Sequence, residues 1–394
     1  MSSFESSIAY LQRLIEFPSV SSTSNREISD WVSNQLEDLG FTIEQTDYQD
    51  RQGVEKVNIV AKRDPISASP SSSGNTELSS SPTNGLAYFC HTDVVPTRGW
   101  NGPDGDPFSP KILNNRLYGR GSCDMKGSLA TMMACAETLD ISHQKKPLWI
   151  VCTADEEVGF LGAKHLVQHS KSYRELISHQ PLGLIGEPTR LSVVHAHKGI
   201  VGYRIISIGK AAHSSSRDGI NANRKIVPFL QRLLEISERT EADPRYHDPR
   251  YDPPTLSWNF GVSDECTAIN ITPDRSTAWV SYRPMPEIDG ADLREEIHHL
   301  AEELNLNVEP CGEGPPMWID SDDPTIQKLS DLANSKPRTV CYGTDGGEFH
   351  ELNHRVVFGP GDIAQAHTTD EWIDLDQLAQ GTDTYSKVIR HWCC

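Results

Sequence analysis

Three short apolar segments, each followed by acidic or histidine residues, constrain the fold of this chain more than any other feature. They are Leu86–Cys90, Leu148–Cys152 and Leu182–Ile185. Apolar runs of this length are typical of strands that are buried on both faces of a sheet. Apolar residues at helical spacing lie between them, over 128–139 and 161–169. Strands and helices in alternation predict an α/β domain whose sheet is mostly parallel and carries helices on both faces.

The polar residues that follow these strands are predicted to meet at one edge of the sheet. His91-Thr92-Asp93 follows the first strand, Asp155-Glu156-Glu157 the second, and Glu187 the third. Parallel strands end at the same edge, and ligands of open α/β sheets bind there. His91 and Asp93 are two residues apart and share a face, so the Asp93 carboxylate can orient the His91 imidazole.

The middle of the chain has a different rhythm. Strands are predicted over 199–207, 255–262, 268–282 and 305–310, and helices over 221–237 and 289–304. The order βαββαβ describes a two-layer, ferredoxin-like unit with its own core. We therefore expect one domain in two parts, 1–192 and 315–394, with a second domain of 193–314 inserted between them. Residues 64–84, which are rich in Ser and Pro, are predicted to form a mobile surface loop.

The charge balance argues against nucleic acid and membrane partners. Acidic residues number 55 and basic residues 36, which gives a net charge of −19. No cluster of Lys and Arg offsets this excess, so phosphate backbones and anionic lipids are not expected partners. The sequence shows no signal segment and no apolar run of about 18 residues. Its nine cysteines contain no CxxC pair, so we expect reduced thiols in a cytoplasmic protein.

Two histidines and several carboxylates of the first predicted domain are residue types that bind metal ions. The histidines are His91 and His367, and the carboxylates are Asp124, the acidic triplet 155–157 and Glu187. Imidazole nitrogen and carboxylate oxygen are the ligands of divalent ions of the zinc type. Two ions about 3.5–4 Å apart require one bridging carboxylate and can share one water. One carboxylate beyond those needed for coordination would then be available as a general base.

Single residues of this set also have simpler interpretations. Asp124 precedes an apolar helix and could be its N-cap. The acidic triplet could lie in a solvated loop, where its charges need no partner. If the triplet is buried instead, a cation must hold its three carboxylates together, because like charges repel strongly at low dielectric.

Seven motifs, in order and over nearly the whole chain, resemble the dinuclear zinc deacylase and carboxypeptidase family. This family includes acetylornithine deacetylase, succinyl-diaminopimelate desuccinylase, aminoacylase and zinc-dependent carboxypeptidases, and the acetylornithine deacetylase type is the most similar. The motifs are His91-Thr-Asp-Val-Val-Pro96, Tyr118-Gly-Arg-Gly-Ser-Cys-Asp-Met-Lys-Gly127, Thr153-Ala-Asp-Glu-Glu-Val-Gly159, Ile185-Gly-Glu-Pro-Thr189, His197-Lys-Gly199, Gly209-Lys-Ala-Ala-His-Ser-Ser215 and Gly359-Pro-Gly-Asp-Ile-Ala-Gln-Ala-His367.

The resemblance implies a role for each residue of the metal site. One metal would be held by His91 and Glu187, the other by His367 and Glu157, with Asp124 bridging them, Asp93 behind His91 and Glu156 as general base. It also implies a non-proline cis peptide between Asp124 and Met125. Cys123 departs from the family pattern, and it would be either a thiol near the metals or a buried, inert one.

The substrate-binding residues are implied in the same way. Arg283 matches the arginine that receives the substrate carboxylate, to which its planar guanidinium is suited. The resemblance makes 1–192 and 315–394 the catalytic domain and 193–314 a lid and dimerisation domain. Asn270 matches an asparagine of the lid that helps to place the substrate. Thr344 and Gly346 correspond to a loop that contacts the substrate. His213 corresponds to a histidine that reaches the active site of the partner subunit, although a surface histidine in a polar turn is the alternative.

The implied activity is hydrolysis of the amide bond of an N-acyl-L-amino acid, with N-acetylornithine as the expected substrate, in arginine biosynthesis. The expected cofactors are two divalent metal ions, zinc in the first place and cobalt or manganese as alternatives. A homodimer formed through the lid is expected. The alternatives are a succinyl-diaminopimelate desuccinylase, a dipeptidase or carboxypeptidase on the same centre, and a non-catalytic metal- or ligand-binding protein.

Overall fold

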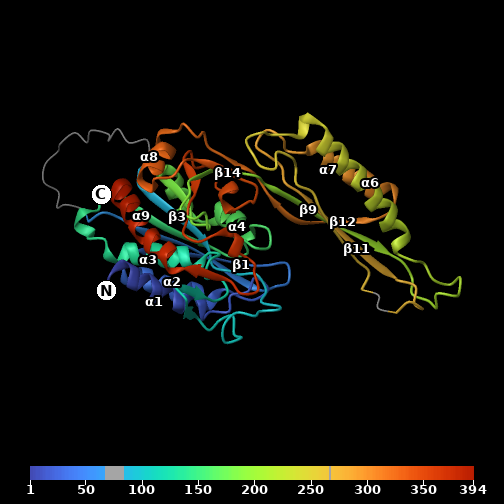
Figure 1. Ribbon diagram of the computed structural model, residues 1–394, viewed down its shortest axis with the longest axis horizontal. Helices are drawn as coiled ribbons and strands as arrows, with labels where there is room; N and C mark the ends of the chain where they lie inside the picture. The colour runs from blue at the N-terminus through green and yellow to red at the C-terminus, as the bar shows by residue number, and fades with distance from the viewer. Residues whose placement is uncertain (67–83, 266–267) are drawn as a thin grey trace. The chain divides into compact units, whose positions relative to one another are not determined.

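The computed structural model describes residues 1–66, 84–265 and 268–394, which divide into two compact units (Figure 1). Unit 1 comprises Met1–Ala196, Trp318–Arg338 and Thr344–Cys394, and unit 2 comprises His197–Met317 and Thr339–Gly343. The mobile loop predicted over 64–84 lies, apart from its ends, outside the described residues.

Unit 1 is built on a nine-stranded sheet in the order β1-β2-β6-β3-β7-β15-β8-β13, with β14 paired to β8. The four strands β6, β3, β7 and β15 are parallel, whereas β1, β2 and β8 pair antiparallel on either side of them. The strands are β1 (Thr42–Gln49), β2 (Glu55–Arg63), β3 (Leu86–His91), β6 (Leu148–Thr153), β7 (Leu182–Ile185), β8 (Val194–His197), β13 (Met317–Trp318), β14 (Arg338–Val340) and β15 (Arg355–Val357). The predicted parallel sheet is confirmed at its centre.

Helices cover both faces of this sheet because its central strands are buried on both faces. Leu86, Tyr88 and Cys90 of β3 point into one core, which α1, α2, α3, α8 and α9 share. On the other face, Phe89 stacks against Phe349 with ring centroids 4.3 Å apart, and α4 and α5 pack there. The helices are α1 (Ser3–Ile15), α2 (Arg26–Asp38), α3 (Lys126–Thr138), α4 (Leu161–His169), α5 (Lys171–His179), α8 (Pro324–Ala333) and α9 (Leu375–Cys393).

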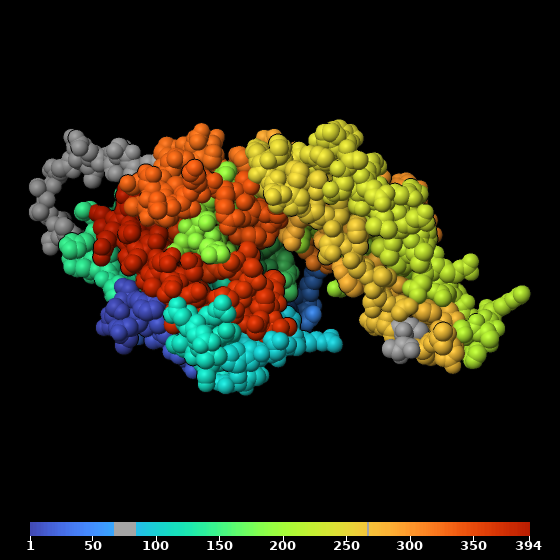
Figure 2. All heavy atoms as spheres, viewed as in Figure 1, coloured from blue at the N-terminus to red at the C-terminus, as the bar shows by residue number. Residues whose placement is uncertain are grey.

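The two ends of the chain pack together in unit 1. Helix α9 contacts α1 and α3, and the red and blue surfaces of these terminal segments are adjacent in Figure 2. A small antiparallel sheet, in the order β16-β5-β4, links the C-terminal segment to the chain before α3. Its strands are β4 (Lys111–Leu113), β5 (Arg116–Tyr118) and β16 (Trp372–Asp374). These contacts bring residues near 120 and near 370 into one neighbourhood.

Unit 2 has the predicted βαββαβ order, with an antiparallel sheet in the order β10-β11-β9-β12. Its elements are β9 (Ile200–Ile208), α6 (Asn223–Ala242), β10 (Asn259–Ser263), β11 (Arg275–Tyr282), α7 (Ala291–Glu303) and β12 (Asn307–Gly314). The strand predicted over 255–262 begins only at Asn259. Lys198 donates hydrogen bonds to the carbonyl of Thr255 and the hydroxyl of Ser257. Thr255 and Ser257 are thus held by this lysine side chain, and residues 255–258 are not part of the strand.

The strand predicted over 268–282 is also shorter, because it begins at Arg275. Pro273 has no N–H to donate to a sheet, and the residues before it form turns that contact the His213 segment. In the described part of the chain, no helix is both long and apolar enough to cross a bilayer.

Candidate metal centre and active site

The ends of three neighbouring strands bring the predicted site residues together in unit 1. Strand β3 lies between β6 and β7 and is parallel to both. His91 is the last residue of β3, the acidic triplet follows β6, and Glu187 follows β7. The carboxyl ends of parallel strands meet at one edge, and these side chains converge there.

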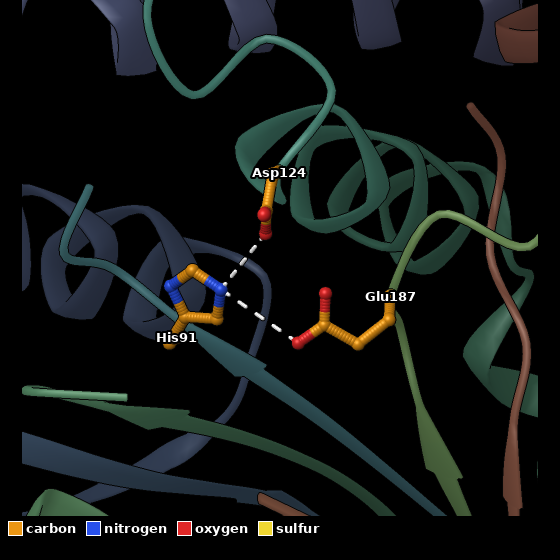
Figure 3. A group of neighbouring side chains, drawn as sticks. All are labelled: His91, Asp124 and Glu187. Carbon is orange, nitrogen blue, oxygen red and sulfur yellow. Dashed lines mark hydrogen bonds and ion pairs between the residues drawn. The ribbon is translucent and has the colours of Figure 1, made fainter. Parts of the chain in front are cut away.

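Two buried carboxylates approach the imidazole of His91 (Figure 3). Its Nε2 atom lies 3.1 Å from Oδ1 of Asp124 and 3.7 Å from Oε1 of Glu187. One donor atom of each residue lies within 4.8 Å of the other two. We refer to His91, Asp124 and Glu187 as the first triad.

A second triad is formed by His367, Glu157 and again Asp124. Nε2 of His367 lies 2.9 Å from Oε2 of Glu157 and 3.4 Å from Oδ2 of Asp124. Asp124 therefore presents one carboxylate oxygen to each histidine. The His367 side chain is 55% exposed, whereas the first triad is buried, so the second triad lies on the solvent side of the centre.

The backbone around Asp124 excludes its interpretation as a helix cap. The peptide bond between Asp124 and Met125 is cis, and Met125, not Asp124, occupies the N-cap position of α3. The adjacent Cys123 is fully buried, and its thiol donates to the Asp362 carbonyl at 3.3 Å. Burial raises the pKa of the Cys123 thiol well above its usual value, so Cys123 is the inert kind of thiol.

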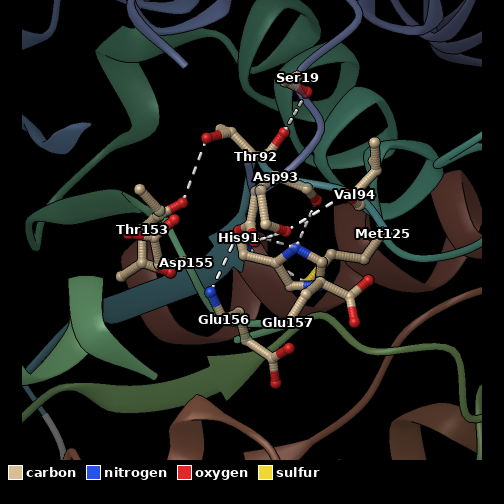
Figure 4. Close-up of polar contacts among 12 residues, drawn as sticks. Ser19, His91, Thr92, Asp93, Val94, Met125, Thr153, Asp155, Glu156 and Glu157 are labelled. Carbon is tan, nitrogen blue, oxygen red and sulfur yellow. Dashed lines mark hydrogen bonds and ion pairs between the residues drawn. The ribbon is translucent and has the colours of Figure 1, made fainter. Parts of the chain in front are cut away.

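Asp93 connects the first triad to Glu156 (Figure 4). Oδ2 of Asp93 accepts a hydrogen bond from Ser21 at 2.7 Å, and Oδ1 accepts one from the backbone N–H of Glu156 at 3.2 Å. Nδ1 of His91 lies 2.9 Å from the Asp93 carbonyl oxygen. A carbonyl can only accept, so Nδ1 carries a proton, and Nε2 is the ring nitrogen that faces Asp124 and Glu187. This orientation makes Nε2 the atom available to a metal ion once its own proton is lost.

A buried lysine holds the acidic triplet in place. Nζ of Lys56 lies 2.7 Å from Oδ1 of Asp155, and the Tyr48 hydroxyl donates to Oδ2 at 2.8 Å. Both charged side chains are only 1% exposed, so the solvated-loop interpretation is wrong for Asp155. The acidic triplet predicts a nearby cation but does not identify it, because no local pattern distinguishes Lys56 from other strand residues.

Several carboxylates lie close together in this buried centre, and their proximity shifts the pKa values of the residues around them. Burial, together with the charge of Asp124, raises the pKa of Glu187 well above its usual value and that of Glu157 to about 7. Burial likewise raises the pKa of Glu156, against the opposing effect of His91. Hydrogen bonds to Asp124 and Glu157 raise the pKa of His367 to about 10.

Asp124 responds in the opposite direction. Burial opposes its ionisation, but its hydrogen bonds with His367 and His91 outweigh this effect and lower its pKa. In the metal-free protein, the protonated histidines therefore supply the positive charge that balances these carboxylates. Two divalent ions would supply that charge better, and the donor set of each triad, one imidazole and two carboxylates, suits zinc-type ions.

The loop at 344–347 contributes a buried carboxylate that sequence analysis missed. Thr344 caps this turn by accepting the N–H of Gly346 at 3.0 Å. Between them, Asp345 accepts a hydrogen bond from Thr153 at 2.5 Å and lines a small cavity together with His91 and Glu187. Burial raises the pKa of Asp345 to about 7. The family resemblance selected Thr344 and Gly346 as substrate contacts. Asp345, the residue between them, is the one that lies beside the first triad.

The other three predicted residues belong to unit 2. His213 and Asn270 lie close together there, because the N–H of Ser214 donates to the Asn270 carbonyl at 3.0 Å. Both side chains are exposed. Nδ1 of His213 is 2.7 Å from the Ser215 hydroxyl. Arg283 follows β11, and its backbone N–H donates to the Leu256 carbonyl at 2.6 Å.

Similarity to known proteins extends over most of the chain. Residues 87–391 match the model of peptidase family M20/M25/M40. An acetylornithine deacetylase from Myxococcus xanthus is 31% identical over 396 residues, which cover 98% of this chain and 97% of the relative.

Solved structures share the fold. Human carnosine dipeptidase 1 superposes with a TM-score of 0.75 at 15% identity, covering 99% of this chain and 97% of its own. An M20 family metallo-carboxypeptidase from Sulfolobus solfataricus has a TM-score of 0.72 at 16% identity, covering 98% of this chain and 99% of its own. The chain is a metal-dependent amidohydrolase that belongs to peptidase family M20/M25/M40.

Proposed function

We propose that this protein hydrolyses the amide bond of an N-acyl-L-amino acid and that its substrate is N-acetylornithine. The observation that carries the proposal is the 31% identity to an acetylornithine deacetylase along 98% of the chain. The two triads that share Asp124 support it, because they supply the ligands for a dinuclear centre.

In this proposal His91 and Glu187 of the first triad would hold one zinc ion, and His367 and Glu157 of the second would hold the other. Asp124 belongs to both triads and would be a ligand common to the two ions. When bound, the ions lower the pKa of a water molecule and polarise the acyl carbonyl. Glu156 accepts the proton of the attacking water and passes it to the leaving amine nitrogen. Burial raises the pKa of Glu156, which helps this carboxyl group to hold the proton between the two transfers.

Five further residues are proposed to contact the substrate. Arg283 pairs with its α-carboxylate through two parallel N–H bonds, and Asn270 contacts it from the same unit. Thr344 and Gly346 contact it from unit 1. His213, supplied by the partner subunit, donates a hydrogen bond to the oxyanion that forms on the acyl carbon.

A homodimer through unit 2 is part of the proposal. Exposed apolar side chains on α6 support it: Val227 and Leu234 are 63% and 49% exposed. They are seven residues apart and lie on one face of the helix. An exposed apolar face of a helix is typical of a protein interface.

The test compares substrates on one preparation. Purified protein is stripped with a chelator, reloaded with Zn²⁺ or Co²⁺, and assayed on N-acetylornithine, N-succinyl-diaminopimelate and dipeptides. We expect no turnover without metal and the highest kcat/KM on N-acetylornithine. A higher kcat/KM on either other substrate would assign the centre to that reaction, and absence of hydrolysis on all three would leave a binding protein.

A further inference from the structure

Glu371 lies outside the two triads, and its carboxylate accepts four hydrogen bonds. Glu371 is 1% exposed. Its Oε1 atom accepts the backbone N–H groups of Cys123 at 2.8 Å and Asp124 at 3.0 Å. Its Oε2 atom accepts the backbone N–H of Gly121 and Nη1 of Arg120, both at 2.8 Å. Four donors thus converge on one buried carboxylate, an arrangement that fixes their relative positions.

These bonds join the two chain segments that carry Asp124 and His367, two of the three residues of the second triad. Residues 120–124 end in Asp124, and residues 367–371 begin with His367. Arg120 and Glu371 are 251 residues apart in sequence. Arg120 also donates from Nη2 to the Thr368 carbonyl at 2.9 Å, so its planar guanidinium spans both ends of the second segment.

We infer that Glu371, together with Arg120, is a positioning residue that sets the separation of Asp124 from His367 and thereby the metal affinity of the centre. The inference rests on the proposed metal centre. The distance at stake is the 3.4 Å between Oδ2 of Asp124 and Nε2 of His367, which a chelated ion must fit. Outer groups that orient metal ligands typically account for about 10–100-fold in affinity.

The alternative is that the pair is a purely structural buried ion pair. Breaking it would then lower stability, as removal of one partner of any buried pair does, without altering metal binding. The two interpretations differ in one readout, the affinity of the folded, metal-free protein for a metal ion.

The test uses Glu371→Gln in the full chain. The glutamine has the size of glutamate, but its NH₂ group can only donate and must face backbone N–H donors. We expect Co²⁺ titration of the metal-free variant to show about 10–100-fold weaker binding, with an unchanged circular dichroism spectrum. Arg120→Lys keeps the charge and loses the fork between Glu371 and Thr368, so it should weaken binding in the same direction and to a smaller extent. Arg120→Lys decides the question if Glu371→Gln does not fold.

Glu44→Gln is the matched control. Glu44 accepts the backbone N–H groups of Lys171 and Ser172 and the hydroxyl of Ser170, at distances of 2.6–3.0 Å, at the start of a different helix. This control should lower the melting temperature and keep wild-type Co²⁺ affinity. If the folded Glu371→Gln and Arg120→Lys proteins also keep wild-type affinity, Glu371 is only structural and the inference is overturned. If wild-type protein binds no Co²⁺, the proposed metal centre itself fails.

Discussion

Glu156 and Glu157 are adjacent in the chain, yet the structure gives them different surroundings. Glu157 contacts His367 at 2.9 Å and belongs to the second triad. Glu156 belongs to neither triad, and its backbone N–H is held by Asp93. A carboxylate that lies beside the proposed metal centre without being one of its proposed ligands is suited to proton transfer.

Glu156→Gln should therefore separate catalysis from metal binding. The amide cannot accept the proton of the attacking water, so kcat should fall by about 10²–10⁴-fold, while the two metal ions stay bound. Elemental analysis of the dialysed protein and steady-state kinetics measure the two effects. Glu157→Gln is the neighbouring control and should lose metal as well as rate. A Glu156→Gln enzyme with wild-type kcat would contradict the assignment.

The raised pKa values predict that metal binding releases protons. In the metal-free protein, His367 has a pKa of about 10 and Glu157 of about 7, so His367 is protonated and Glu157 about half protonated at pH 7. A metal competes with these protons, so affinity should rise with pH through both pKa values and level off above about 10. We expect the second triad alone to release about one to two protons at pH 7. Calorimetry in buffers of different ionisation enthalpy measures this number.

His367→Gln tests the source of the protons. The glutamine has no proton to lose, so the variant should release fewer protons and its affinity should depend less on pH above neutrality. A wild-type protein that binds metal without releasing protons would show that the histidine is already neutral before binding.

At the scale of elements, part of the site follows from local sequence and part does not. Apolar runs followed by His91, the acidic triplet and Glu187 identify strand ends, because the signal lies within a few residues. Asp124 and His367 lie after turns without such a pattern, so residue type alone made them candidate ligands, and the family resemblance gave each its metal. Lys56 and Glu371 were missed altogether. Each acts through a partner about 100 or more residues away, and side-chain pairing at that separation leaves no periodicity in the sequence.

The Lys56–Asp155 pair leads to a prediction about how strand β2 supports the acidic triplet. In Lys56→Met the Asp155 carboxylate remains buried without its cation, so the free energy of unfolding of the metal-free protein should fall by about 3–5 kcal/mol. Urea unfolding followed by circular dichroism measures the change. Lys62→Met, in the same strand, is the control. Lys62 pairs with the exposed Glu175 and Asp64, and its loss should cost less than about 1 kcal/mol. Equal losses in both variants would contradict a special role for Lys56.

At the scale of the whole molecule, the proposed chemistry is divided between the two units. Unit 1 contains both triads and Glu156, whereas His213, Asn270 and Arg283 belong to unit 2. If His213 serves the active site of the partner subunit, each active site of a dimer is built from two chains. Defects in different units then affect different sites of a mixed dimer, which makes the division testable by complementation.

Co-expression of His213→Ala and Glu156→Gln chains should restore activity that neither variant has alone. In a mixed dimer, one site combines the intact unit 1 of the His213→Ala chain with His213 of the Glu156→Gln chain. With random pairing about half of the dimers are mixed and one of their two sites is intact, so about a quarter of wild-type activity is expected. Glu156→Gln combined with Asp124→Asn is the control, because both changes lie in unit 1 and leave no intact site in any dimer. Activity equal to the sum of the separate variants in both mixtures would mean that His213 does not act across the dimer.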